Sequence, residues 1–386
     1  MEEAQRHRLQ QINVELAQLT AKFQQNLVDA TNAVEWLITE EKRRSGLPES
    51  AKEAAAASAR LKGKQGWRFT LQAPSRQAVL RFADDATWRQ QVWRASVTLA
   101  AAPPFDNRPV IAQQLALRRE KAALLGYANF ADLQTEDRMA GSGEGVKRFL
   151  VTLEERARPG FEKDRAELQA FRRSLEGPNA AEIQAWDVEY YAEKLRQKQF
   201  ALDEEQLRPY YPIEHVIAGL FELARRLYGI QIVEQKTAEV WHPDVKFFQV
   251  KDADGSLLGR FYSDWFPREN KRSGAWMSPV SVGGPDQGQW RPHLGMIVGN
   301  VTPPVAGKPA LLTHREVETI FREFGHLLHL LFGKSELRGL GGIRVAWDFV
   351  ELPSQIMENF TWERPVLDLV AAHYETGEKL PEVSFA

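Results

Sequence analysis

Apolar residues recur near the start of the chain at intervals of three and four positions. They are Leu9, Ile12, Leu16, Leu19, Phe23 and Leu27. This spacing predicts an amphipathic helix over residues 4–28 with a narrow apolar seam. Such a seam needs a helical partner, and the pattern leaves two candidates open. The partner is either another helix of the same chain or a second copy in a coiled coil.

Helical patterns dominate the chain up to about Gly229. A second helix is predicted to begin near Pro48 and to run through an alanine-rich stretch, because proline suits a first helical turn and alanine favours helix. Further helices are predicted over residues 109–125, 146–175 and 207–228. Gly126 and Gly229 follow the first and last of these, where a left-handed stop is common. Only residues 67–72 alternate like a strand in this half.

Strand patterns replace helical ones after Gly229. Residues 230–235 predict a strand, and two further strands, 245–250 and 257–266, flank a turn-rich run and predict a hairpin. Residues 293–301 predict one more strand. Between these strands, residues 278–292 are rich in Gly, Pro and Gln and predict a flexible loop. Helical patterns then resume toward the end of the chain.

The composition is that of an ordinary soluble globular protein. The chain has 386 residues, of which 43% are hydrophobic and 26% charged, so we expect two subdomains or one large, mostly helical body. The net charge of −2 gives no reason to expect nucleic acid or an anionic membrane as a partner. Neither a signal-peptide core nor an apolar run of about 18 residues is present, and we expect a cytoplasmic protein.

Cysteine is absent from the sequence. This excludes a disulfide framework, thiolate metal ligands and thiol nucleophiles. It fits a reducing compartment.

Residues 313–333, THREVETIFREFGHLLHLLFG, predict a helix with a polar stripe. Thr313 and Glu316 form a capping box that starts it, and glycine ends it at residue 333. At about 100° per residue, Arg322 and His326 lie one turn apart on the same side. Glu323 and His329 join the same stripe.

A zinc helix of a peptidase carries two histidines at positions i and i+4, with a glutamate next to the first. Here the glutamate (Glu323) and the second histidine (His326) are present, but the first position holds Arg322. Glu351 could supply a carboxylate from a second element. Alternatively, Asp348 and Glu351 form only another capping box.

Two further polar residues follow Glu351 at helical spacing. Gln355 and Glu358 would share its face at i+4 and i+7. They could orient metal ligands through hydrogen bonds, or they could be solvated. The residues alone decide neither this question nor whether half a zinc motif binds metal.

The run FREFGHLLH, followed by WDFVELPSQIMEN, resembles the signature of the thimet oligopeptidase family of zinc metallopeptidases. In that family the helix reads H-E-F-G-H, and a downstream E-x-P-S-Q carries a glutamate. The resemblance extends to FQQNLVDATNA, LDEEQLRPYYP, WHPDVKFFQV, ENKRSGAWM, GKPALLTH and HYETGEKLP. It therefore covers essentially the whole chain.

The resemblance implies a mainly α, two-lobed helical metallopeptidase of the neurolysin type. It implies a deep channel and a small β-hairpin or sheet region beside the zinc helix. Residues 1–82 would be part of an N-terminal helical lobe, and residues 83–386 a catalytic domain that lacks its C-terminal part. The family continues past the position of Ala386, with a histidine and tyrosines that bind substrate and stabilise an oxyanion. A second chain could complete the domain.

The resemblance also implies an activity. The family hydrolyses short unstructured peptides in the cytoplasm with one Zn²⁺ per chain. By position, His326 and Glu351 would be zinc ligands and Glu323 the general base. His329 would lie close to the ligands or pack in the core, and for Gln355 and Glu358 both alternatives given above stay open. Residues Gly274 and Ala275 would flank an edge strand offered to the substrate.

Arg322 departs from the family pattern at the first ligand. A guanidinium has no lone pair for a metal and stays protonated. We therefore predict that zinc binding is weak or lost, and that Arg322 pairs with Glu351 or Glu323 instead. His329 could replace the missing ligand. However, the family has a histidine at this position as well, in addition to its pair of ligands, and this favours a packing role for His329.

Three interpretations of the function follow. The chain is a zinc metalloendopeptidase by descent with low or absent activity, or a non-catalytic peptide-binding pseudoenzyme. In the third interpretation, Arg322 is a sequence error or an engineered change, and the native residue at this position is histidine. Each implies short peptides as partners, with neither nucleic acid nor membrane.

Overall fold

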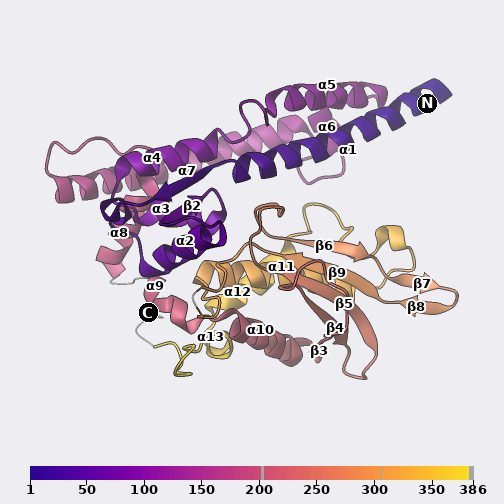
Figure 1. Cartoon of the computed structure of the whole chain (residues 1–386). Helices are drawn as coiled ribbons and strands as arrows, with labels where there is room; N and C mark the ends of the chain where they lie inside the picture. Colours follow the sequence, from indigo (N-terminus) through magenta and orange to yellow (C-terminus); the bar gives the residue numbers. More distant parts are fainter. Residues whose placement is uncertain (201–203, 306, 382–386) are drawn as a thin grey trace. The chain divides into compact units, whose positions relative to one another are not determined.

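The computed structural model describes residues 1–200, 204–305 and 307–381 (Figure 1). Residues 201–203, which fall within the predicted run of helices, and the last five residues lie outside this description. The described chain contains thirteen α-helices and three small sheets, so the predicted mainly α fold is confirmed. It divides into two compact units, Met1–Ala201 and Leu202–Ala386. The predicted boundary between residues 82 and 83 concerns the lobes of the family and stays a prediction.

The first unit begins with the predicted amphipathic helix, α1 (Glu3–Asn32), which packs along α5 (Arg108–Leu124) (Figure 1). The Arg8 guanidinium joins the two helices by donating to Glu120, with 2.6 Å between Nε and Oε1. A helix of the same chain therefore covers the apolar seam. This contact supports the internal helical hairpin rather than the coiled coil.

A small core follows in the same unit. Strand β1 (Glu35–Ile38) pairs antiparallel with β2 (Trp67–Thr70), the strand predicted from the alternating residues. Helix α2 (Glu49–Leu61) begins directly after Pro48, as predicted. Helices α3 (Ala73–Phe82) and α4 (Ala86–Val97) close the core, in which the rings of Phe69 and Trp88 meet edge to face at 4.9 Å.

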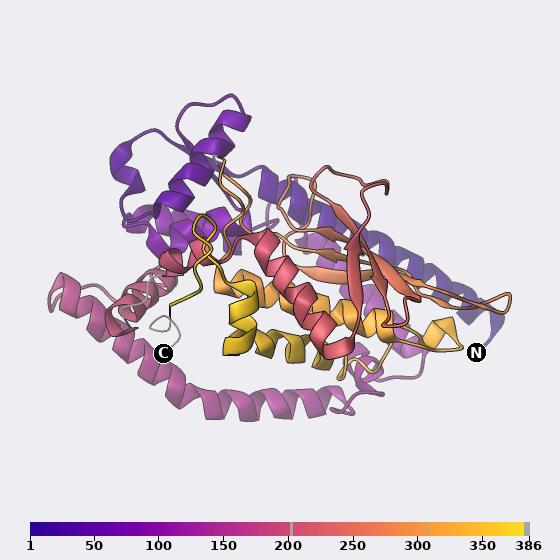
Figure 2. The same ribbon diagram turned by 90° about the horizontal axis from the view of Figure 1, so that it is seen from below.

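The longest helix of the first unit is α7 (Gly143–Glu176), which follows the short α6 (Phe130–Thr135) (Figure 2). Its C-terminal part packs against α8 (Val188–Phe200) through Phe171, Tyr190 and Tyr191. Beside this contact, the buried Arg89 guanidinium donates to Asp187 at 2.6 Å. Removing either partner of a buried pair costs about 3–5 kcal/mol.

The second unit contains a five-stranded sheet. The strands are β3 (Gln231–Glu234), β4 (Lys246–Lys251), β5 (Leu257–Asp264), β6 (Trp276–Ser281) and β9 (His293–Val298), and their order is β3-β4-β5-β9-β6. All neighbours are antiparallel except β5 and β9. The hairpin and the two single strands predicted here are confirmed. Among the described residues, no strand pairs with the outer side of β6, which is therefore an edge strand.

Two local predictions in this unit are wrong. Residues 278–292 do not form a loop, because they contain the end of β6 and a ribbon of β7 (Gly284–Asp286) and β8 (Gln289–Arg291). In the turn of this ribbon, Gln287 and Gly288 have φ of 48° and 79°. Two such positive angles suit a tight hairpin.

The predicted helix over residues 207–228 is divided near its start. The chain forms α9 (Glu204–Leu207), a 3₁₀ turn η2 (Arg208–Tyr210) and then α10 (Ile213–Tyr228). Proline interrupts the pattern, since Pro212 is the extended residue before α10. The end at Gly229, with φ of 73°, agrees with the prediction.

Helix α11 (His314–Phe332) packs on the sheet against β9, β6 and β5. It also packs against α12 (Leu352–Asn359), while α10 packs against α13 (Arg364–Val370). The predicted helical run after α11 is broken by the short 3₁₀ turns η3 (Arg338–Leu340) and η4 (Phe360–Trp362). The core between sheet and helices contains the stacked rings of Phe248 and Phe261, with Phe324 of α11 beside Phe261.

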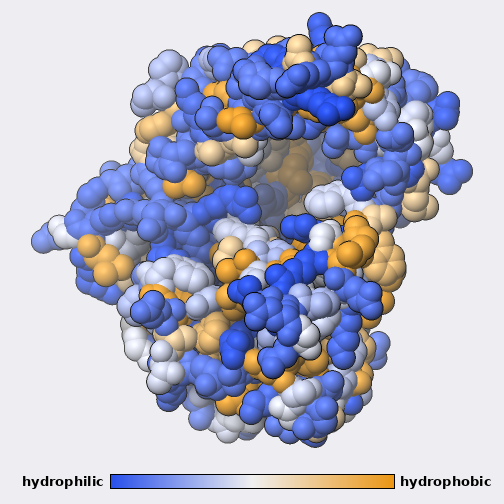
Figure 3. Space-filling view, turned by 90° about the vertical axis from the view of Figure 1, so that its right-hand side faces the viewer, coloured by the Kyte–Doolittle hydropathy of each residue, from blue (hydrophilic) through white to orange (hydrophobic). Residues whose placement is uncertain are grey.

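Large hydrophobic residues are exposed in both units, among them Phe149 and Trp347. Figure 3 shows one face of the molecule, on which hydrophobic groups lie among hydrophilic ones. Among the described residues, no helix has both the length and the apolar character needed to cross a membrane.

Candidate active site

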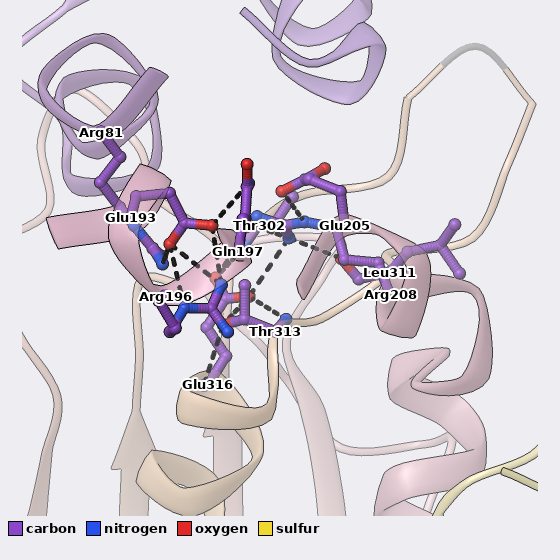
Figure 4. A network of polar contacts seen from close by, with 10 residues as sticks. All are labelled: Arg81, Glu193, Arg196, Gln197, Glu205, Arg208, Thr302, Leu311, Thr313 and Glu316. Atoms are coloured by element: carbon purple, nitrogen blue, oxygen red, sulfur yellow. Dashed lines mark hydrogen bonds and ion pairs between the residues drawn. The ribbon is translucent and has the colours of Figure 1, made fainter. Parts of the chain in front are cut away.

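The predicted capping box positions the start of α11. The Thr313 Oγ1 accepts from the Glu316 N–H at 3.2 Å, and the Glu316 carboxylate accepts from the Thr313 N–H at 2.8 Å. The same carboxylate accepts from the backbone and hydroxyl of Thr302, and Arg208 lies 3.7 Å from it (Figure 4). One carboxylate therefore fixes the first turn of α11 to two other segments of the unit.

A buried histidine of β9 fixes the other end of α11. The Gly283 N–H donates to Nδ1 of His293 at 3.0 Å, so Nε2 carries the proton and donates to the Gly333 carbonyl at 2.7 Å. Burial holds the pKa of His293 below its ordinary value, although the bond to Gly333 opposes this. His293 thus has a structural role.

Between these ends, Arg322 joins two carboxylates. Its Nη2 donates to Oε1 of Glu323 at 2.8 Å, and its Nη1 donates to Oε2 of Glu351 at 2.9 Å. His326 Nε2 lies 3.3 Å from the same oxygen of Glu351. The structure therefore brings together all four residues at which the sequence placed the ligands and the base, and it shows both of the hypothesised ion pairs of Arg322.

Glu351 reaches this group because α12 approaches α11 closely. It is the residue directly before α12, and the Ser354 hydroxyl donates to its Oε2 at 2.8 Å. The approach requires glycine at position 325, because a Cβ there would lie 2.7 Å from the Pro353 carbonyl oxygen. Since α12 starts after Glu351, the alternative capping box from Asp348 does not begin this helix.

The surroundings shift the pKa values of the carboxylates in opposite directions. Burial raises the pKa of Glu323, which is 1% exposed, while Arg322 opposes the rise and Glu351 adds to it. Partial burial acts to raise the pKa of Glu351 as well. However, the Ser354 hydroxyl, His326 and Arg322 together hold the pKa of Glu351 below its ordinary value.

The pKa values of the two histidines of the stripe lie below their ordinary value. Burial lowers the pKa of His326; Arg322 acts in the same direction and Glu351 opposes it. Burial also lowers the pKa of His329, whose ring lies 6.1 Å from that of Phe349. Among the described residues, neither Nδ1 atom has a hydrogen-bond partner. Among the described hydrogen bonds and ion pairs, none joins His329 to Glu351, which agrees with a packing role.

These residues do not fit a three-ligand zinc site as they stand. Within residues 1–200, 204–305 and 307–381, no three side chains of His, Cys, Asp or Glu are placed to hold a metal ion. The guanidinium of Arg322 occupies the position between the two carboxylates and offers no lone pair. A dication there would also have to accept a fixed positive charge beside it.

The other residues predicted near the site lie in two segments. Gln355 and Glu358 belong to α12, and Gly274 and Ala275 precede β6. The described contacts of Arg322, Glu323, His326 and Glu351 include neither Gln355, which is exposed, nor Glu358.

Gly274 and Ala275 directly precede the edge strand β6, as the sequence suggested. The Asn300 side chain donates to the Gly274 carbonyl at 2.7 Å. The backbone of Met277 in β6 lies close enough to the Glu323 carboxylate to oppose the rise in its pKa. The start of β6 therefore lies beside the carboxylate predicted as the base.

Sequence reasoning missed the residues that hold the start of β6 in place. The Lys271 ammonium is buried and donates to Oδ1 of Asp264 at 2.9 Å and to the Phe266 carbonyl at 2.8 Å. Burial lowers the pKa of Lys271 to about 8, although Asp264 opposes this. Sequence reasoning also missed Ser354, whose hydroxyl donates to Glu351. The available signal was its position three residues after Glu351.

The helical fold, the small sheet and the polar stripe of α11 define a class of peptidase. The sequence model of "Peptidase family M3" matches residues 79–385, and the chain belongs to this family. The resemblance to the thimet oligopeptidase family is thereby confirmed.

Among characterised proteins, the chain is similar to oligopeptidase A of Escherichia coli, with 43% identity over 379 residues. This match covers 96% of the chain and 55% of the relative. Oligopeptidase A of Haemophilus influenzae is 40% identical, over 99% of the chain and 57% of the relative. The dipeptidyl carboxypeptidase of Salmonella typhimurium is 35% identical, over 98% and 56%. The chain thus spans about half the length of the curated relatives that it matches.

Proposed function

We propose that this chain is an oligopeptidase A-type member of the family in which an internal salt bridge has replaced the zinc centre. Its ancestral reaction is endopeptidase cleavage of short cytoplasmic peptides, and its own hydrolytic activity is low or absent. The observation that carries this proposal is the double ion pair of Arg322, with 2.8 Å to Glu323 and 2.9 Å to Glu351.

Charge balance supports the replacement. The carboxylate of Glu323 is buried, and an ionised carboxylate in such a place needs a cation or hydrogen-bond donors. A zinc ion supplies that charge in the family, whereas here the guanidinium supplies it through charge-assisted hydrogen bonds. A metal ion that bound here would have to displace the Arg322 guanidinium, which would then lose its ion pairs with Glu323 and Glu351. Zinc binding is therefore disfavoured by the lost ligand and by the lost ion pairs together.

The edge strand β6 supports a second candidate, a non-catalytic peptide-binding protein. An extended peptide can add to an exposed sheet edge through main-chain hydrogen bonds, which need no metal. The start of β6 is held by Asn300 and Lys271 and lies beside Glu323. Short unstructured peptides are the partner class that this geometry suits.

Metal analysis after incubation with zinc and dialysis tests the proposal. The chain as it stands should retain far less than one zinc per molecule, because only two of the three ligand positions carry a donor. Arg322→His should raise retained zinc toward about one per molecule. Arg322→Lys is the matched control, since it keeps the charge but restores no ligand. Near-full zinc in the unchanged protein, or no gain in Arg322→His, would contradict the proposal.

A binding assay separates the two candidates. Fluorescence anisotropy with a labelled short peptide should give the same affinity with and without a chelator if β6 binds peptides in the absence of metal. Cleavage of a quenched peptide by the unchanged chain, abolished by the chelator, would instead show a working metallopeptidase. Undetectable peptide binding under both conditions would remove the second candidate.

A further inference from the structure

The free edge of β6 offers an added strand only a short ladder of hydrogen bonds. Backbone donors on one side of a strand recur at every second residue. Pro279 has no N–H, and proline is tolerated in a strand where its nitrogen faces away from the neighbouring strand. Because Pro279 pairs with Gly295 of β9, its nitrogen faces the free edge. The register also shifts between Pro279 and Ser281. An extended peptide can therefore pair regularly only with the start of β6.

The start of β6 lies beside the residues that Arg322 joins. The backbone of Met277 is close to the Glu323 carboxylate, which in turn accepts from Arg322 at 2.8 Å. We call Arg322, Glu323, His326 and Glu351 the Arg322 group. A short peptide that is paired with the start of β6 brings one of its ends toward this group.

Glu351 carries an open acceptor in the Arg322 group. Its described partners all contact Oε2: the Arg322 Nη1 at 2.9 Å, the Ser354 hydroxyl at 2.8 Å and the His326 Nε2 at 3.3 Å. Among the described residues, no hydrogen bond or ion pair reaches Oε1, and the side chain is 48% exposed. One oxygen of an anchored carboxylate is therefore left for a ligand.

The charges of the Arg322 group favour one end of a peptide over the other. Two carboxylates, those of Glu323 and Glu351, share a single guanidinium. A further carboxylate at the C-terminal end of a peptide would be repelled by Glu351. An α-ammonium is a compact cation with several N–H donors, and it can form a charge-assisted hydrogen bond to Oε1. Capture of an N-terminal amine is a recurring mode of peptide recognition.

We propose that the Arg322 group selects short peptides with a free amino terminus. The α-ammonium donates to Oε1 of Glu351, and the residues after it pair with the start of β6. This inference rests on the second candidate proposed above, peptide binding at β6 without metal. It gives the site a requirement that an endopeptidase, which cuts within a chain, does not have.

Two labelled peptides that differ only at the amino terminus test the proposal. Both are short, lack Lys, Arg and His, and carry a fluorophore at the C-terminal end; one has a free α-amine and the other is acetylated. At pH 7 the free amine is mostly charged, since its pKa is about 8. Fluorescence anisotropy in the presence of a chelator should show that the free-amine peptide binds about fivefold more tightly, as expected for a partly exposed ion pair.

The outcomes separate this proposal from the one on which it rests. Equal affinities of the two peptides would overturn the selection of a free amino terminus and leave peptide binding at β6 intact. Binding of neither peptide would remove peptide binding itself, and this proposal with it.

Glu351→Gln tests the residue directly, because it removes the charge and keeps the shape while Arg322 stays paired with Glu323. The affinity for the free-amine peptide should fall to that for the acetylated peptide, which should not change. Glu358→Gln is the matched control: Glu358 lies in α12 and has no described contact with the Arg322 group, so the preference should remain. A preference that persists in Glu351→Gln, or loss of both peptides there, would overturn the proposal.

Discussion

Helices α7 and α11 carry the same kind of amphipathic pattern but have opposite surroundings. Of the 34 residues of α7, only Phe171 is buried, whereas eleven of the 19 residues of α11 are buried. In α11 the burial includes Glu323 and His326, so polar groups as well as apolar ones are removed from water. In α7 most charged side chains are exposed, although Arg172 is largely buried against Glu176 and Asp187.

This difference shows what periodicity does and does not establish. The spacing of apolar residues predicts that a helix forms and which face is apolar. It does not show whether a partner covers that face. Burial is what shifts the pKa values of Glu323 and His326 and makes the α11 stripe a chemical site. The apolar residues of α7, by contrast, stay largely exposed to water except near Phe171.

The largest expected effect contrasts one phenylalanine from each helix. Phe324→Ala in α11 should lower the free energy of unfolding by about 3–5 kcal/mol, because the ring is 1% exposed and its removal leaves a cavity. Phe149→Ala in α7 should change it by no more than about 0.5 kcal/mol, since that ring is 65% exposed. Urea unfolding followed by circular dichroism measures both. Similar losses in the two variants would break the comparison.

Smaller changes in stability are expected when either of two helical glycines is replaced by alanine, and the two changes should have opposite signs. Gly325→Ala should destabilise the protein by about 1–3 kcal/mol, because the new Cβ would lie 2.7 Å from backbone atoms of Pro353 and Ser354. Gly160→Ala should instead stabilise it by about 0.5–1 kcal/mol, since no atom lies within 4 Å of the added Cβ. Thermal unfolding of the two variants checks the signs. A neutral Gly325→Ala would show that α12 does not need this close approach.

The smallest effect concerns pH and the end of α11. Because burial holds the pKa of His293 below 6.5, the unfolded chain binds a proton at this residue at a higher pH than the folded chain does. Stability should therefore rise with pH between the lowered pKa and about 6.5, and be lost as pH falls through this window.

His293→Gln should reduce this slope by up to about 1.4 kcal/mol per pH unit. Part of the slope should remain, because His326 and His329 also have lowered pKa values. Denaturation midpoints between pH 5 and 7 provide the measurement, and exposed His7→Gln is the control. An unchanged slope in His293→Gln would show that folding does not shift the pKa of this histidine.

Much of the fold was predictable because its signals are local. The capping box at Thr313 and the stops at Gly229 and Gly333 each depend on a few neighbouring residues, and the structure shows all three. The β7–β8 ribbon was not predictable in this way, since its Gly and Pro content is equally typical of a loop. Pairing across the ribbon decides between these two outcomes, and pairing is not local.

The candidate site likewise has one part that the sequence predicted and another part that depends on how the helices pack. Spacing placed Arg322, Glu323 and His326 on one stripe, and the family resemblance added Glu351 from a separate element. The role of Ser354 and the approach at Gly325 depend on how α12 packs on α11, which no periodicity in either helix encodes. The buried Lys271 beside Asp264 was likewise invisible, because a lysine in a polar segment is ordinarily solvated.

The contacts that hold the two ends of α11 have a consequence for how this protein could evolve. Glu316 secures the first turn and His293 secures the last, and neither belongs to the group around Arg322. Because neither contact involves position 322, an exchange there can alter the charge of the middle turn while both ends of α11 stay anchored.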